Sequence, residues 1–475
     1  VLALYEKIFA AGRYHYLSSS SDVAPPDLLG LWTGDTNVGW SGYYHLDANL
    51  NLQISSGNVG NMPEAMEGYF HLMDAWKDDF RTNARKLLKC RGFLSGGNSP
   101  GATSGIISAL NFAYPYQYVT GGEAWLLYPF WEYYEITRNK DFLRDRLYPY
   151  LQEMGYFYED FLTEKDENGK YIFAGSISPE SQPKGLGLSL TNNSTFDITG
   201  AEFILKTLLK TCEILGIEES DEAHLARWQQ ILNDLPPYLI NKDGALSEWS
   251  WPSLKDSDNY GHRHSSHMIG VWPYRSINAE DTPKLYEAAQ IALQKKDGNS
   301  YENAGHGLLH SAMIAANLNN GESANSKLLR FLKDGFYFDS LTTAHYNNQG
   351  VFCTDVANTV PGIMMEMCMS STEDTLEILP AIPSDLSKGS ISGLKAKCQV
   401  TLDQLDWDLE EGSVVCKLTS DVDQTINFIL RDGISSIESD ADIENSDLGD
   451  IARKINLKAN TATELKIRLA EDGER

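Results

Sequence analysis

The hydrophobic period of the chain changes once, and this change constrains the fold more than any other feature. In the first part, apolar residues such as Ile204 and Leu208 recur at the spacing of an amphipathic helix. In the last part they alternate, as in residues 414–418, which is typical of strands with one buried face. We therefore predict a mainly α protein with a β appendage: a helical catalytic domain over 1–374 and a small β-sandwich over 375–475.

The helical part holds roughly ten helical segments with no alternating strands between them, which disfavours a βαβ fold. Helices in series, joined by long loops, suit an α/α toroid whose loops gather at one mouth; a two-layer helical array is the alternative. Asn61 is expected to cap the second helix, with Pro63 and Glu64 in its first turn. The predicted helices are one at the N-terminus and segments 61–90, 125–136, 142–162, 196–215, 221–234, 282–295, 306–318, 322–334 and 357–370.

Charge and hydropathy limit the kinds of molecule that the protein is expected to bind. The formal net charge of −27 argues against nucleic acid and anionic membrane surfaces, which would repel the protein. Aromatic residues make up 11% of the chain, which supports a carbohydrate ligand, although a large helical core would also use them. No apolar run approaches membrane-spanning length, so no membrane insertion is expected. The chain begins at Val1, which indicates a processed or trimmed start.

The six cysteines are scattered and form no CxxC pair, so zinc and redox motifs are absent. Cys212 and Cys368 lie in apolar helical patterns and are predicted to be buried free thiols. Cys398 and Cys416 lie in alternating patterns and could face one another across a sheet. The sequence leaves their pairing open.

The stretch 43–53 carries polar groups on alternate residues: His45, Asp47, Asn49 and Asn51. In an extended segment, this period places all four side chains on one side. The residues around them are aromatic or apolar, so a row of hydrogen-bonding groups here suits a site that binds a polyhydroxylated ligand. A solvated strand or loop is the alternative.

Two further loops carry carboxylates. Pro179 stiffens the backbone just before Glu180, and Asp355 precedes an apolar helix. Inverting glycoside hydrolysis needs an acid and a base roughly 6.5–9.5 Å apart, and loops converging on one barrel mouth could supply them. Each carboxylate alone has an ordinary explanation: Glu180 as a surface acid, and Asp355 as a helix N-cap.

Residues 262–267 read His-Arg-His-Ser-Ser-His. They lack the HExxH spacing and the glutamate of a zincin, although three close histidines could still bind a metal. We favour Arg263 and His264 as a pair that donates to ligand hydroxyls or holds a carboxylate. No metal site is predicted, and no phosphate-binding glycine loop, nucleophile elbow or Rossmann fingerprint is present.

A series of short motifs, in order along nearly the whole chain, resembles glycoside hydrolase family 95, which comprises inverting α-L-fucosidases and α-L-galactosidases. Each motif is weak alone, but the ordered set is specific. The motifs are GRY at 12–14 with SSS at 18–20, LLGLW at 28–32, YHLDANL at 44–50, GGEAW at 121–125, SPE at 178–180, HRHSSH at 262–267, DVAN at 355–358 and LPAIP at 379–383.

The resemblance implies an (α/α)6 barrel followed by a β-sandwich domain. It implies that Glu180 is the general acid and that Asn49 is an amide base polarised by Asp355. It implies a glycan substrate and no metal or organic cofactor, favours an extracytoplasmic or secreted location, and leaves the oligomeric state open. The substrate-binding residues it suggests are His45, Trp125, Arg263 and His264.

The chain also departs from the family pattern. The family has asparagine where this chain has Asp47, which could be a direct carboxylate base or the mark of a silenced or retuned site. The family's MNYWP becomes ISSGN at 54–58, so an aromatic wall is expected to be lost, and DGNFG becomes DVANT at 355–359. The usual N-terminal β-sandwich is absent; removal of that segment and a lineage without it both stay open.

We therefore predict an inverting exo-glycoside hydrolase that removes a terminal α-L-fucose or a related L-sugar. Glu180 is expected to be held protonated near neutral pH, and Asn49, helped by Asp355 and Asp47, to activate water. The alternatives are a non-catalytic carbohydrate-binding pseudoenzyme and another α/α-barrel glycosidase, for example one acting on α-L-galactosides. A polysaccharide lyase is a further alternative, which the charge of −27 disfavours.

Overall fold

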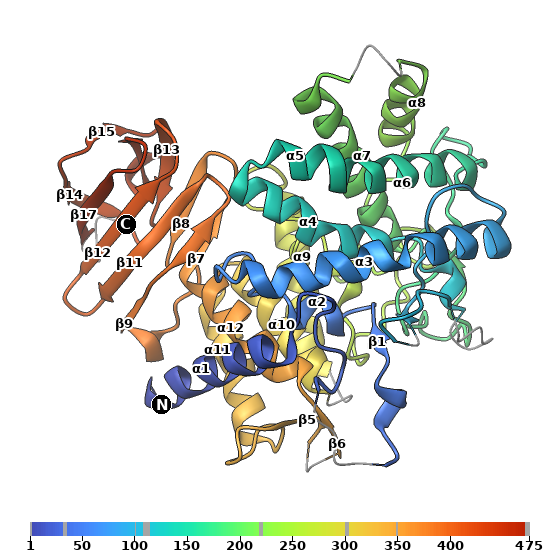
Figure 1. The fold of residues 1–475 in the computed structure, drawn as a ribbon, viewed down its shortest axis with the longest axis horizontal. Coiled ribbons are helices and arrows are strands. Elements are labelled where there is room, and N and C mark those ends of the chain that lie inside the picture. The colour runs from blue at the N-terminus through green and yellow to red at the C-terminus, as the bar shows by residue number, and fades with distance from the viewer. Residues whose placement is uncertain are drawn as a thin grey trace.

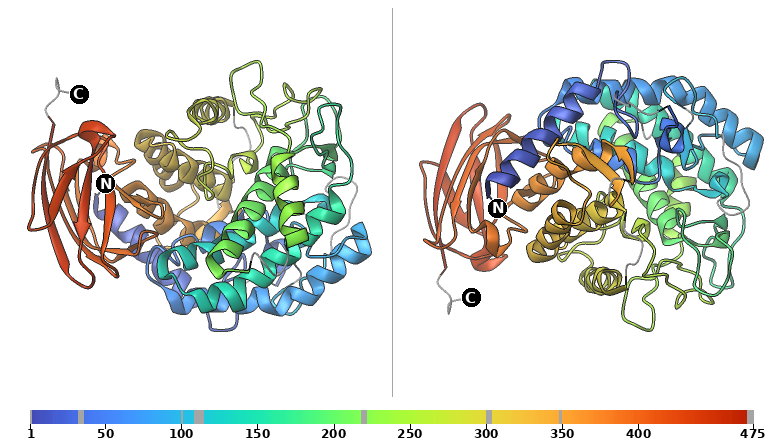
Figure 2. Two further views of the ribbon diagram at one scale, coloured as in Figure 1. Left: turned by 90° about the horizontal axis from the view of Figure 1, so that it is seen from above. Right: turned by 90° about the horizontal axis from the view of Figure 1, so that it is seen from below.

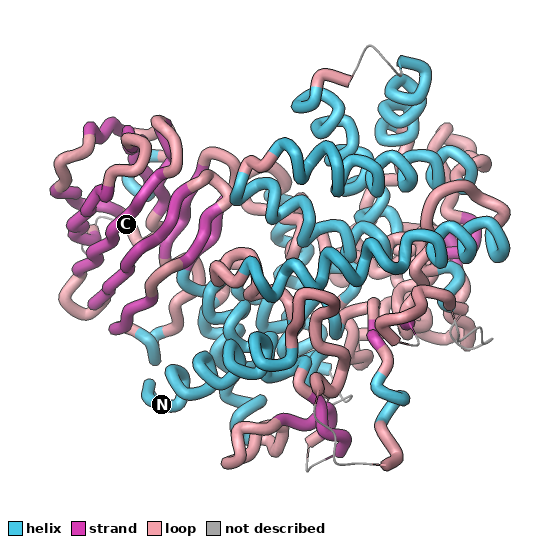
Figure 3. The backbone as a smooth tube through the Cα atoms, in the orientation of Figure 1, coloured by secondary structure: helices cyan, strands magenta, loops and turns pink. Residues whose placement is uncertain are grey.

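The computed structural model describes residues 2–31, 36–99, 101–107, 115–217, 222–299, 304–347 and 350–470. Helices make up the first part of the chain and strands the last, which lies at one side of the molecule (Figures 1 and 3). None of the described helices is long and apolar enough to cross a bilayer. The helices are α1 Leu2–Ser19, α2 Asn49–Gln53, α3 Pro63–Asn83, α4 Gly122–Thr137, α5 Lys140–Phe142, α6 Tyr148–Phe161, α7 Thr195–Leu215, α8 Glu222–Asn233, α9 Pro283–Asn299, α10 Gly305–Asn317, α11 Gly321–Lys333 and α12 Asp355–Cys368.

The helices form an α/α toroid, as predicted (Figure 2). Helices α4, α10 and α12 are buried on nearly all sides, as expected of an inner layer. Helix α11 buries only one face, which carries Ala324, Leu328 and Phe331 at helical spacing, and it packs on α10 from outside. The hydrophobic pattern of each helix thus decides whether it lies in the inner or the outer layer.

The prediction that residues 43–53 form one extended segment is wrong. Only Tyr44–His45 is a strand, β1, which pairs with β2 (Asn98–Ser99); the chain then turns into the short helix α2. The amide of Asn51 donates to the carbonyl of Trp125 at 3.0 Å, and that of Gln53 to the carbonyl of Pro26 at 2.7 Å. These polar side chains satisfy buried backbone groups and do not line a ligand site.

The predicted N-cap at Asn61 is also wrong. Met62 is the residue before the first turn of α3, and Asn61 lies in the left-handed region with φ +56°. Asparagine tolerates that conformation better than most residues, so Asn61 turns the chain instead of capping the helix. Pro63 and Glu64 lie in the first turn, as predicted.

The C-terminal strands form two sheets around one apolar core, so the predicted β-sandwich is confirmed. Strand β7 already pairs with β8 in the second sheet, and we therefore propose the domain boundary between Cys368 and Met369, slightly before the predicted one. All six cysteines are buried free thiols, so Cys398 and Cys416 form no disulfide. The strands are β7 Met369–Ser371, β8 Thr375–Ile378, β9 Lys388–Ile391, β10 Leu394–Ala396, β11 Val400–Asp408, β12 Ser413–Ser420, β13 Gln424–Ile429, β14 Ile434–Glu438, β15 Asp442–Asn445, β16 Ala452–Leu457 and β17 Ala462–Leu469.

Helix α1 packs against α12, and a glycine permits the close approach (Figure 1). A Cβ atom on Gly12 would lie 2.4 Å from the carbonyl oxygen of Ala357 and 2.7 Å from Cδ of Pro361. This contact matters for function because α12 begins at Asp355, one of the predicted site residues.

We expect Gly12→Ala to destabilise the protein by about 1–3 kcal/mol, because overpacking forces the two helices apart. The free energy of unfolding from urea titration measures the effect. Gly298→Ala in α9 is the matched control, since a Cβ there meets nothing within 4 Å; it should be neutral or stabilise by up to ~1 kcal/mol. Equal effects of the two substitutions would contradict the packing argument.

Candidate active site

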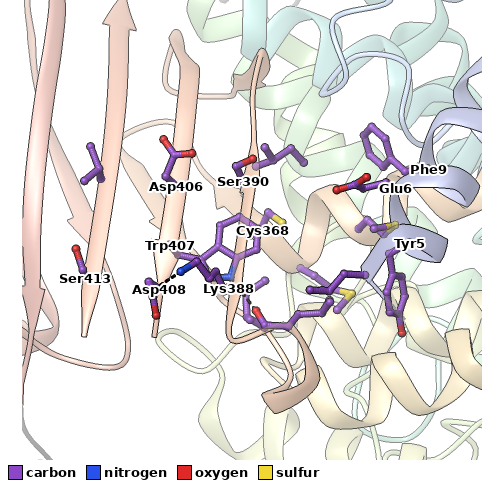
Figure 4. A pocket seen from close by; sticks show the side chains of 18 residues that line it. Tyr5, Glu6, Phe9, Cys368, Lys388, Ser390, Asp406, Trp407, Asp408 and Ser413 are labelled. Carbon is purple, nitrogen blue, oxygen red and sulfur yellow. Dashed lines mark hydrogen bonds and ion pairs between the residues drawn. The ribbon is translucent and has the colours of Figure 1, made fainter. Parts of the chain in front are cut away.

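A large cavity of about 640 Å³ lies between α1, the end of α12 and the edge of the β domain (Figure 4). Its walls are mainly apolar, and Trp407 donates its indole N–H to the carbonyl of Leu386 at 2.8 Å. Asp408 is neutralised by Lys388 at 2.7 Å. Figure 4 shows the acidic side chains of Glu6 and Asp406 on different walls of this cavity, and we do not assign the active site to it.

A second cavity, of about 250 Å³, contains most of the predicted site residues. It is smaller than the ~300–1,000 Å³ pockets that hold drug-sized ligands, which suits a single sugar ring. Its walls come from loops and element ends that are far apart in the sequence, as expected at the mouth of a toroid. The lining residues are Leu28, Trp40, His45, Asp47, Asn49, Asn98, Tyr116, Glu180, Arg263, His264, His306, His345 and Tyr346.

Glu180 lies in the loop after β3 (Ala174–Ser176) and has φ +55°, a conformation that is strained for a residue with a Cβ and is often found at functional sites. Tyr116 donates its hydroxyl to Oε1 at 2.8 Å. Arg263 donates to Oε2, which lies 3.2 Å from Nε2 of His264. Glu180 is therefore held from both sides.

These contacts decide the charge of Glu180. Burial raises the pKa of the carboxyl group, but His264, Arg263 and Tyr116 stabilise the carboxylate and bring its pKa well below the usual range. The prediction that the site holds Glu180 protonated near neutral pH is therefore wrong for the protein without substrate. A proton must reach this group before it can act as an acid.

Arg263 and His264 lie in a loop that a buried lysine holds in place. Lys296 of α9 is 4% exposed and donates to the carbonyl oxygens of His262 and His264, both at 2.7 Å. The ammonium group replaces the backbone partners that an irregular buried loop lacks. This support gives Arg263 and His264 a defined position next to Glu180.

Asn49 and Asp355 meet where two helices begin. The amide Nδ2 of Asn49 donates to Oδ2 of Asp355 at 2.5 Å. Burial raises the pKa of Asp355, while hydrogen bonds from Cys353 and Asn49 oppose that rise, and the α12 N-terminus also favours the anion. Because its N–H group is engaged, Asn49 keeps its carbonyl oxygen as an acceptor for water.

Asp47 faces Glu180 within the same cavity. It is 3% exposed, and one of its oxygens lies within 4.8 Å of an oxygen of Glu180 and a nitrogen of His264. Burial and the negative charge of Glu180 raise the pKa of Asp47 to about 6. The three groups could offer metal ligands, but Arg263 already occupies the Glu180 carboxylate, and its cation would repel a metal ion.

Buried imidazoles form another wall. Burial lowers the pKa of His45 to about 4 and that of His345 to about 3, so both are neutral near pH 7. The ring of His306 stacks on that of His345 at 4.8 Å, and its Nε2 lies 3.4 Å from Nε2 of His264. A neutral imidazole can donate one hydrogen bond and accept another, which suits binding to sugar hydroxyls.

The structure brings together all the predicted site residues except one. Trp125 is 1% exposed and packs against Phe196, Trp272 and His310, outside this cavity. We do not assign it to the site.

Sequence reasoning missed several cavity residues, including the aromatic ones. Trp40 is 41% exposed, and its ring lies 4.7 Å from that of His345 and 6.0 Å from that of Tyr346. An aromatic wall thus exists despite the altered segment 54–58. Its only sequence signal was the position of Trp40 just before the polar stretch. The other missed residues are Leu28, Asn98, Tyr116 and His306.

Two family models together match nearly the whole chain. The glycosyl hydrolase family 95 catalytic domain matches residues 2–368, and the C-terminal domain of the same family matches 370–467. The chain belongs to glycoside hydrolase family 95. The resemblance noted in the sequence is therefore confirmed over both domains.

Curated relatives of this family 95 chain include alpha-L-fucosidase 2 of Arabidopsis thaliana, 29% identical over 437 residues, which cover 87% of this chain and 49% of the relative. A probable alpha-fucosidase A of Aspergillus niger is 26% identical over 420 residues, which cover 82% of this chain and 50% of the relative. The chain spans about half the length of the curated relatives it matches.

Solved structures share the fold at low identity. A putative kojibiose phosphorylase from the human microbiome matches with a TM-score of 0.62 at 14% identity, over 96% of this chain and 64% of that one. An alpha-L-rhamnosidase of Dictyoglumus thermophilum matches with a TM-score of 0.54 at 9% identity, over 97% of this chain and 49% of that one. These likenesses support the toroid architecture of the family 95 chain.

Proposed function

We propose that this protein is an exo-glycoside hydrolase that removes a terminal α-L-fucose, or a closely related L-sugar, with inversion. The observation that carries the proposal is one sugar-sized cavity in which Glu180 lies between Tyr116, Arg263 and His264, and which the Asn49–Asp355 pair also reaches. The names of the curated relatives, both α-fucosidases, support the choice of sugar.

Each group has a role in this reaction. Glu180 donates a proton to the glycosidic oxygen as the bond to the anomeric carbon breaks. Asn49, fixed by Asp355, accepts a hydrogen bond from the attacking water and passes its proton to solvent. Arg263 and the imidazoles hold the hydroxyl groups of the sugar through directed hydrogen bonds.

The position of Asp47 bears on the choice of base. In inverting glycosidases the acid and the base lie roughly 6.5–9.5 Å apart, with a water molecule between the base and the sugar. Asp47 has an oxygen within 4.8 Å of Glu180, which leaves too little room for sugar and water between them. We therefore assign water activation to Asn49 and Asp355.

The same spacing supports a second candidate. In retaining glycosidases the two carboxyl groups lie only about 5–5.5 Å apart, and one acts as the nucleophile. Asp47 would fill that role if it were ionised, but burial and Glu180 raise its pKa to about 6. Stereochemistry distinguishes the two candidates.

We expect β-L-fucose to appear first when the protein acts on 2′-fucosyllactose, because inversion turns the α-linkage into a β-hemiacetal. A proton NMR time course of the anomeric signals measures this, with a parallel sample of Glu180→Gln as the control. First release of α-L-fucose would contradict inversion and assign Asp47 as the nucleophile. Release only from α-L-galactosides would change the sugar, and ligand binding without any product would indicate a pseudoenzyme.

A further inference from the structure

The side chains of Asp47 and Glu180 line the same cavity, but different groups balance their negative charges. The guanidinium group of Arg263 and Nε2 of His264 both contact Oε2 of Glu180. In the part of the chain that the structure describes, no such ion pair is recorded for Asp47, which is 3% exposed. Two carboxylates this close cannot both be ionised without a large cost, so the one that forms no ion pair keeps the proton.

We propose that Asp47 and Glu180 share one proton, which Asp47 holds until substrate binds and then supplies to Glu180. Asp47 is then a positioning residue that acts through the general acid, and not the base that activates water. The inference rests on the proposed hydrolase function and names the source of the proton that Glu180 lacks in the protein without substrate. The pKa of Asp47, raised to about 6, agrees with it.

Every proton that is released in the proposed catalytic cycle is also replaced. The O–H bond of Asp47 breaks and its proton reaches Glu180 through a bridging water or sugar hydroxyl, since the two carboxyl groups have oxygens within 4.8 Å but form no direct hydrogen bond in the described structure. Glu180 transfers the proton to the glycosidic oxygen, and the bond to the anomeric carbon breaks. The attacking water gives a proton to solvent past Asn49, and Asp47 regains one proton from solvent.

The other groups around the pair are consistent with this assignment. His45, His306 and His345 are neutral near pH 7 because burial lowers their pKa, so they add no positive charge that would ionise Asp47. Burial and the charge of Glu180 raise the pKa of Asp47, and His264 and Arg263 only partly oppose that rise. The carboxyl group of Asp355 faces Asn49. Among the described residues, the titratable and charged groups around the cavity are His45 of β1, Tyr116 of a short 3-10 helix, Glu180 of a loop, Arg263 and His264 before α9, His306 of α10, His345 and Tyr346 of β5 (Thr343–Tyr346), and Asp355 of α12.

The first test is the pH dependence of kcat/KM on 2′-fucosyllactose. Activity that needs the shared proton falls as pH rises through the pKa of Asp47, about 6. In Asp47→Asn the repulsion that keeps a proton on the pair is gone, so the falling limb should move down by roughly one pH unit or more. At pH 7 the variant should then lose about tenfold or more relative to wild type, and recover at lower pH.

The second test needs no substrate that is cleaved. Infrared difference spectra of the wild-type protein should show protonated-carboxyl absorption that disappears near pH 6, and the part due to Asp47 should be missing in Asp47→Asn. Asp27, whose pKa burial also raises to about 6, contributes equally to both proteins. Three results would overturn the proposal: the same carboxyl absorption near pH 6 in both proteins, a wild-type activity that rises through pH 6, or an equal loss in Asp47→Asn at every pH. The Asp47 absorption without any glycoside cleavage would leave the proton sharing intact and refute the hydrolase function instead.

Discussion

Replacing Glu180 by glutamine should lower kcat by roughly 10²–10⁴-fold on substrates with poor leaving groups, such as fucosyl-lactose. Glutamine keeps the size of the side chain and can still accept hydrogen bonds from Tyr116 and Arg263. It has no acidic proton to give to the glycosidic oxygen. The loss measures protonation of the leaving group and not a loss of binding, so KM should change much less than kcat.

The leaving group provides the internal check on this prediction. The fluoride ion of α-L-fucosyl fluoride leaves without being protonated, so Glu180→Gln should retain most of its activity on that substrate. Glu248→Gln is the matched variant: Glu248 is 2% exposed and accepts from Ser178 at 2.7 Å, but it does not line the cavity. Normal turnover of fucosyl-lactose by Glu180→Gln, or an equal loss in Glu248→Gln, would remove Glu180 from the role of acid.

The architecture was predictable because it depends on patterns that persist over many residues. Helix α7 (Thr195–Leu215) matches the predicted segment 196–215, since its apolar residues keep one period over several turns. The five residues of α2 make little more than one turn, so their own sequence cannot establish a helical period. Contacts with residues distant in the sequence determine this conformation: the amides of Asn51 and Gln53, part of the polar stretch that suggested a strand, donate to the carbonyls of Trp125 in α4 and of Pro26.

The active-site residues could be predicted from the sequence only where they belong to a family motif. Glu180 and Arg263 lie 83 residues apart and touch only because two loops meet at the toroid mouth. His306 and His345 come from a helix start and a strand, and no local pattern distinguishes them from core histidines. The charge of Glu180 also depends on this meeting, because burial alone would have raised its pKa.

The pairing of Asn49 with Asp355 leads to the second large effect. Asp355→Asn should lower kcat by roughly 10²–10⁴-fold, the range expected when a positioned base is lost. The oxygen of a second amide can still accept the Nδ2 hydrogen bond of Asn49, which is 2.5 Å long in the wild type, but it carries no negative charge. The Asn49 amide is then less polarised, and its carbonyl oxygen becomes a weaker acceptor for the proton of water. Asn49→Ala removes that oxygen outright and should cost a similar factor.

The decisive measurement is kcat/KM of the two single variants and the double variant. Groups that act as one unit are not additive, so the double variant should be no slower than the worse single variant. Asp258→Asn is the matched control: Asp258 also accepts from a buried asparagine, Asn241 at 2.6 Å, but lies outside the cavity. It should reduce stability and leave kcat nearly unchanged. Independent losses that multiply in the double variant would show that Asn49 and Asp355 act separately, and water activation would then have to be assigned to another group.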